Sequence, residues 1–229
     1  MTDGQIRAQI AAAINRLPQP VLGLVSAVDP TNHAVKVTIQ PDGVETGWLP
    51  FNTIASGDLR VSAPPHLGQH VQVVPQEGDA EHNVVTGCLF DDVVTAPVSP
   101  ATGAVAQPGE ILIMAGCGAP PQNATSRTVG AVTAGAPYWH LTPAALYFGA
   151  GTVQATIKDG SCSVVIGACT LTLTSSGLAV TGGTITTDKD MTAQGTVTGE
   201  SDVKTSGHSL NEHVHTNGND GSDTGGPVG

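Results

Sequence analysis

The chain has 229 residues and a formal net charge of −11, which leaves room for one large domain or two small ones. The acidic excess argues against binding to nucleic acid or to anionic lipid, because both select basic patches. Aromatic residues make up only 3% of the chain, and 29 residues are glycine. This composition is typical of short strands and turns around a thin core. No apolar run reaches about 18 residues, so no transmembrane helix is expected.

Residues 3–17 carry the one clear helical pattern, with Ile6, Ile10 and Ile14 recurring on one side. Pro18 ends the pattern, which predicts an N-terminal helix over residues 1–18. Its apolar stripe is narrow. The helix is therefore expected either to pack on a partner chain or the next domain, or to cover its own domain as a lid. No cationic leader precedes it, so a signal peptide is not expected.

Residues 19–98 change to period two. The strand expected over 33–40 places Val35, Val37 and Ile39 on one face, and a Pro-Asp-Gly turn follows it. The five strands expected here cover residues 21–28, 33–40, 44–51, 69–74 and 83–90. Five short strands within about 70 residues predict a Greek-key barrel of the OB type.

Some OB barrels bind nucleic acid, but they do so with a basic groove and stacking aromatic residues. Between residues 19 and 98, only Lys36 and Arg60 are basic, against nine acidic residues. We therefore expect no nucleic-acid binding, and the barrel is expected to be an adaptor to other proteins.

Residues 99–150 form a Pro-, Ala- and Gly-rich connector, or neck, with one expected strand at 110–114. Its aromatic residues cluster in sequence, and two roles are open to them. The first is a plug where the barrel meets the following region, and the second is a site for sugar or peptide. The cluster consists of Tyr138, Trp139, His140, Tyr147 and Phe148.

Residues 151–205 contain repeated short strands separated by turn signals. The strands are expected at 152–158, 161–167, 170–174, 178–181, 184–187, 191–194, 196–198 and 202–205. A three-residue strand with one buried apolar side chain does not form a sheet alone. Three chains wound about one axis would supply neighbours, let apolar side chains meet on the axis and remove free edges. A single-chain parallel β-helix is disfavoured, because it needs longer coils and larger core residues.

Four cysteines lie in the chain without metal or redox spacing. They are Cys88, Cys117, Cys162 and Cys169. They are expected to be small buried thiols, which a reducing cytoplasm would keep reduced.

The last segment, residues 206–229, contains His213 and His215. In an extended chain these side chains point the same way. Two imidazoles do not complete the four-ligand shell of a structural zinc site. Three copies around a threefold axis would supply six nitrogens, which suits an octahedral ion. Asp220 and Asp223 offer carboxylates for a second cation such as calcium.

The segment from Ser206 to Gly218, followed by Thr224-Gly225-Gly226-Pro227, resembles the tip of the phage baseplate central spike. This is the baseplate assembly protein V family of P2- and Mu-like contractile-tailed phages and related tail-like bacteriocins. The resemblance implies a homotrimer, with one iron ion per trimer bound by His213 and His215 of all three chains. It implies partners in the baseplate hub and tail tube, a place at the distal tip of the virion tail, and host entry by piercing the outer membrane.

The expected fold is thus all-β: a short N-terminal helix, an OB-type barrel (19–98), a trimeric intertwined β-helix shaft (151–205) and a metal-bound apex. A spike of the type VI secretion kind is an alternative, but the short chain and the built-in histidine tip disfavour it. A tail-associated glycan-degrading enzyme is another. It needs two carboxylates across a cleft, and no such pair or nucleophile motif stands out, so we expect no enzyme activity.

Overall fold

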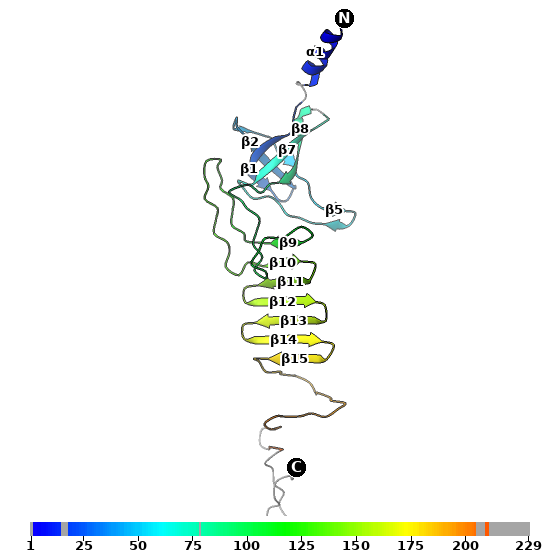
Figure 1. The fold of residues 1–229 in the computed structure, drawn as a ribbon. Coiled ribbons are helices and arrows are strands. Elements are labelled where there is room, and N and C mark those ends of the chain that lie inside the picture. The colour runs from blue at the N-terminus through cyan, green and yellow to red at the C-terminus, as the bar shows by residue number, and fades with distance from the viewer. Residues whose placement is uncertain (1, 15–17, 78, 205–208, 211–229) are drawn as a thin grey trace, which may run out of the picture. The chain divides into compact units, whose positions relative to one another are not determined.

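The computed structural model describes residues 2–14, 18–77, 79–204 and 209–210. It divides into two units, Met1–Thr184 and Ile185–Gly229, and each is described by itself. The first unit contains one helix, a six-stranded sheet, a two-stranded hairpin and a seven-stranded sheet (Figure 1). None of the described helices is long and apolar enough to cross a membrane.

Helix α1 spans Asp3–Ile14, which confirms the predicted helix; residues 15–17 lie outside the described part. A capping box begins it: the Thr2 hydroxyl accepts from the Gln5 amide, and the Gln5 side chain accepts from the Thr2 amide. Ile6 and Ile10 are 43% and 54% exposed, so these members of the apolar stripe are open in the single chain.

The six-stranded sheet closes into the expected barrel. Its strands are β1 (Val21–Asp29), β2 (Ala34–Ile39), β3 (Val44–Glu45), β4 (Leu49–Pro50), β7 (His70–Gln76) and β8 (Asp79–Cys88). They pair in the order β3-β2-β1-β7-β8, and β4 pairs with β2. A parallel bridge between Phe51 and Val85 joins the β4 end to β8 and completes the ring.

Apolar residues at alternate positions along the strands point inward and form the barrel core. Val35 and Val37, which were predicted to share one face, are fully buried there. The core residues are Val25, Val35, Val37, Leu49, Phe51, Val71, Val73 and Val85. The prediction of a single strand over 44–51 is wrong, because the chain forms two short strands there, β3 and β4. Between them the Thr46 hydroxyl accepts from the Val37 amide at 3.0 Å, which replaces a ladder carbonyl.

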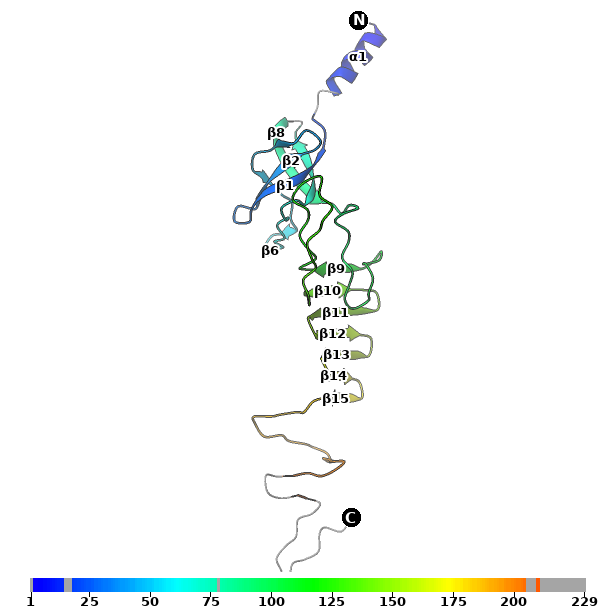
Figure 2. The same cartoon turned by 90° about the vertical axis from the view of Figure 1, so that its left-hand side faces the viewer.

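The seven-stranded sheet is an antiparallel meander in chain order (Figure 1; seen from the side in Figure 2). Its strands are β9 (Ile111–Met114), β10 (Tyr138–Leu141), β11 (Ala145–Ala150), β12 (Val153–Lys158), β13 (Ser161–Ile166), β14 (Cys169–Thr174) and β15 (Gly177–Thr181). The expected strands at 110–114 and between 152 and 181 are confirmed. Gly160 and Gly167 adopt positive φ in two of the turns, which glycine allows without steric cost.

Two expectations for this region need correction. β10 and β11 lie within the segment assigned to a connector, so the sheet begins before residue 151. The strands up to Thr181 also pair with strands of their own chain, whereas they were expected to need strands from other chains. Five- and six-residue strands in register make this possible, because each carries two or three apolar residues on one face.

Residues 184–204 form no described strand, although four were expected between 184 and 205. Described contacts there include an antiparallel bridge from Lys204 to Ser209 and a hydrogen bond from the Leu210 amide to the Val203 carbonyl. Bends recur at residues 182–183, 188–189, 194–195 and 200–201, six residues apart. One large, exposed apolar residue follows each bend: Ile185, Met191, Val197 and Val203. Pairing of these segments with other chains stays a prediction.

Candidate functional site

The seven-stranded sheet presents one face made entirely of apolar side chains. Residues directly opposite on paired strands share a face, so the register gives the rows. One row contains Ile157, Cys162, Leu173 and Leu178. The next row contains Ala155, Val164, Leu171 and Val180. No polar side chain interrupts these rows.

The same rows continue through β9–β11. The face, called the apolar face below, consists of Ile111, Ile113, Trp139, Leu141, Leu146, Phe148, Ala150, Val153, Ala155, Ile157, Cys162, Val164, Ile166, Cys169, Leu171, Leu173, Leu178 and Val180. Eleven of its large residues are between 38% and 63% exposed in the single chain. Exposed apolar surface this continuous is uncommon on a monomer and marks an interaction surface.

The opposite face of β12–β15 is mostly hydroxylic. It carries Gln154, Thr156, Lys158, Ser161, Ser163, Thr170, Thr172, Thr174 and Thr181, with Val165 and Ala179 as its apolar members. A sheet with one apolar and one polar face is built to be covered on one side and solvated on the other. The apolar face is therefore the candidate assembly site.

The aromatic cluster seen in the sequence is divided by the sheet. Trp139 and Phe148 are directly paired on the apolar face and are 40% and 43% exposed. Tyr138, His140 and Tyr147 lie on the other face. The Tyr138 ring covers Gly149, where an added methyl carbon would lie 3.1 Å from it. The two predicted roles of the cluster, a plug and a site for sugar or peptide, stay predictions, and Trp139 and Phe148 are its members on the apolar face.

A buried polar network joins three segments that are far apart in sequence. His140 Nδ1 lies 2.9 Å from Ser99 Oγ, and His140 Nε2 lies 3.2 Å from a Glu110 carboxylate oxygen. Ser99 is 0% and His140 1% exposed. The sequence of hydroxyl, imidazole and carboxylate is that of a hydrolase triad, but a substrate has no access to a fully buried hydroxyl. The network fixes the turn at Ser99 and the start of β9 against β10.

The barrel surface carries an exposed aromatic residue beside paired charges. Trp48 is 51% exposed, and Lys36 Nζ lies 5.6 Å from its ring centroid. The same ammonium is 3.3 Å from Glu45. Hydrogen bonds from Ser26 and then Lys36 lower the pKa of the Glu45 carboxyl. One of the two basic side chains of the barrel is thus engaged by an acid and an indole.

The predicted metal ligands His213 and His215, and the candidate calcium ligands Asp220 and Asp223, lie outside the described residues. Within residues 2–204, gaps aside, no group of three or more histidine, cysteine or acidic side chains could hold a metal. The iron and calcium sites therefore stay predictions.

The four cysteines are unpaired. The expectation that they are buried is wrong for Cys88, which is exposed, and the other three are half-buried. Cys162 and Cys169 belong to the apolar face, which explains their partial exposure in a single chain.

Residues 21–90 match the family described as the type VI secretion system/phage-baseplate injector OB domain. This part of the chain is therefore similar to baseplate-injector OB domains. The match begins at the first residue of β1 and ends just past β8, so it coincides with the closed barrel. It confirms the OB barrel and the resemblance to baseplate spike proteins, and it implies association with baseplate components. No curated protein matches the chain.

Proposed function

We propose that this protein is the central spike of a contractile phage or phage-like tail. The barrel would attach it to the tube end and the baseplate hub, at the distal tip of the tail. One observation carries the proposal: a baseplate-injector OB domain is followed in the same chain by a sheet with a wholly apolar face.

A homotrimer is the assembly that best uses this face. Three sheets whose apolar faces turn toward a common axis enclose a core, while their hydroxylic faces remain in water. Two copies would also cover each other as a sandwich. The two-histidine tip does not decide between them, because six imidazole nitrogens from a trimer complete an octahedron and four from a dimer complete a tetrahedron. The resemblance to trimeric spikes favours three.

In this proposal the function is mechanical and non-enzymatic. Sheath contraction would drive the tube and spike forward, and the point would breach the outer membrane of the host cell. Iron bound by His213 and His215 of three chains would tie the ends together. Such a site has no open position, so it would be structural and would not activate water.

The matched family also includes type VI secretion injectors, and that setting is the second candidate. The two candidates share the trimer and the barrel attachment and differ in the machine that carries the spike. The third candidate, a glycan-degrading enzyme, gains no support from the Ser99–His140–Glu110 network. Ser99 and His140 are buried, so a substrate would not reach them.

Size-exclusion chromatography with light scattering and elemental analysis tests the proposal. The expected result is a trimer with about one iron ion per three chains. A folded monomer or dimer at micromolar concentration would contradict it. A trimer without iron would support the proposed trimeric shaft and contradict the proposed metal-bound apex.

A further inference from the structure

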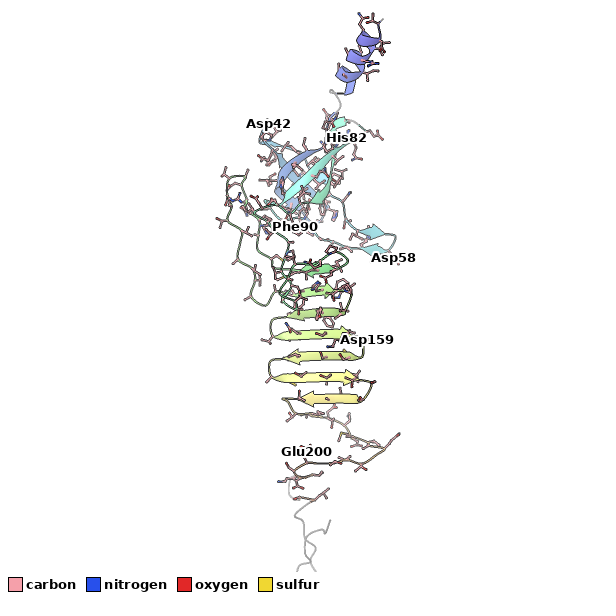
Figure 3. All side chains as sticks on the ribbon, in the orientation of Figure 1. Asp42, Asp58, His82, Phe90, Asp159 and Glu200 are labelled. Carbon is pink, nitrogen blue, oxygen red and sulfur yellow. The ribbon has the colours of Figure 1, made fainter. Side chains whose placement is uncertain are left out.

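A small hairpin stands out from the barrel between β4 and β7. It is formed by β5 (Ala55–Ser56) and β6 (Leu59–Arg60), and Figure 3 shows Asp58 at its tip. Its apolar side chains are largely open: Ile54 is 69%, Leu59 60% and Val61 42% exposed. An isolated two-stranded hairpin is marginally stable in water. We therefore expect another surface to pack against these apolar side chains. Residues 52–61 are called the barrel hairpin below.

A hollow of about 870 Å³ lies where the barrel continues into the connector and β9. Its lining includes Phe90 and Val132, which are 66% and 60% exposed, with Ile113 and the Cys117 thiol. The barrel hairpin does not line it in its own chain. This space is called the neck hollow below.

Close backbone contacts hold the wall of the neck hollow in place. The Gly130 amide donates to Ala119 at 2.8 Å, and the Thr133 amide donates to Gly116 at 2.8 Å. A methyl group at Gly118 would lie 2.2 Å from the carbonyl oxygen of Gly130, so only glycine permits this approach. Because the wall is fixed within one chain, an occupant would meet a formed site and would lose less entropy in shaping it.

We propose that the barrel hairpin of one copy seats in the neck hollow of the next copy around the threefold axis. The proposal rests on the trimer proposed above and names a further contact within it. Ile113 belongs to both the apolar face and the neck hollow, so an interface that covers the face continues directly into the hollow. The hairpin and the hollow are different surfaces. Each copy would give one and receive one, which is the head-to-tail contact that closes a ring.

Chemistry favours a second copy over an unrelated partner as the occupant. The hairpin exposes Ile54, Leu59 and Val61, and the hollow is lined by more apolar than polar residues, with no aspartate, glutamate, lysine or arginine among them. A charged partner would therefore find no counter-charge there, whereas Ile54 and Leu59 would be covered without an unpaired charge. The hairpin's own charges, Asp58 and Arg60, flank Leu59 and would stay at the rim.

Disulfide trapping on the full-length chain tests the contact, with the native Cys117 as one partner. Leu59→Cys, or Ile54→Cys on the same hairpin, is expected to give covalent trimers on non-reducing gels after mild oxidation, because a disulfide forms when the two Cα atoms are within about 7 Å. Asp42→Cys, at an exposed barrel turn, is the matched control and should stay monomeric on the gel. Leu59→Cys combined with Cys117→Ser should also lose the crosslink.

A second measurement does not depend on disulfide geometry. Leu59→Asp should make Cys117 react at least several-fold faster with a maleimide than in the unchanged trimer, while exposed Cys88 keeps its rate. If light scattering shows a trimer but Leu59→Cys and Ile54→Cys both fail to crosslink and the Cys117 rate does not change, the hairpin contact is wrong and the trimer stands. That result would leave the hairpin free for another tail protein. If no trimer forms, both proposals fail.

Discussion

A charge placed on the apolar face should prevent assembly, and Leu171→Asp is the sharpest case. Leu171 lies in the middle of β14, and 42% of it is exposed in the single chain. Fully burying a leucine stabilises by about 1.5–3 kcal/mol, so covering the exposed part contributes about 0.6–1.3 kcal/mol per chain. Three chains give about 2–4 kcal/mol per trimer for this one position.

Leu171→Ala should therefore weaken trimer association by up to that amount, which is about 30- to 700-fold in the dissociation constant. Leu171→Asp should abolish it, because three unpaired carboxylates would be buried near one axis. Sedimentation equilibrium over a range of concentrations measures both effects.

Thr172→Asp is the matched control, since it changes the next residue on the opposite, hydroxylic face. It should leave the trimer intact. If Leu171→Asp forms a trimer as tight as Thr172→Asp does, the apolar face is not the assembly surface and the reasoning from the sheet register is wrong.

Three further outcomes are expected. The fragment 1–98 should fold alone, because the barrel closes within it; a random-coil circular dichroism spectrum would place the domain boundary elsewhere. His213→Ala with His215→Ala should remove the iron and leave the trimer; an unchanged iron content by elemental analysis would exclude these ligands. Acid should release the metal from the unchanged protein below about pH 6.5, because the ion binds neutral imidazole. Met191→Asp should increase hydrogen exchange after residue 184 in the trimer, whereas Thr192→Asp should not; equal exchange in both would place Met191 away from the axis.

Much of the fold could be predicted because alternation is a local signal. Strands β1, β2 and β12–β14 each carry a regular apolar period, and the structure has them at nearly the expected bounds. β10 and β11 were missed because they follow a Pro- and Gly-rich segment and their runs, Tyr-Trp-His-Leu and Ala-Leu-Tyr-Phe-Gly-Ala, show no alternation of apolar and polar residues. The β5–β6 hairpin has two-residue strands, which are too short to show any period.

The sites were harder to predict than the strands, because they depend on register and distant pairing. Each strand shows which of its own residues share a face, but only the register shows that Leu171 lies beside Val164 and Val180. The Ser99–His140–Glu110 network joins three segments with no common motif. Its one sequence signal is a histidine within an otherwise apolar and aromatic run.

The lengths of the successive strands explain where one chain ceases to be enough. Strands β12–β14 have six residues each and β15 has five, and all pair within the chain. After Thr181 the bends recur every six residues, which leaves about four residues and one apolar side chain between them. Four residues do not supply a stable intrachain ladder. Other chains would have to supply the backbone partners there, and one apolar residue per repeat is what a narrow shared axis can accept. In the proposed trimer, dependence on the other chains would therefore rise along the sequence toward the histidine tip, where a bound ion would replace the core that the chain no longer provides.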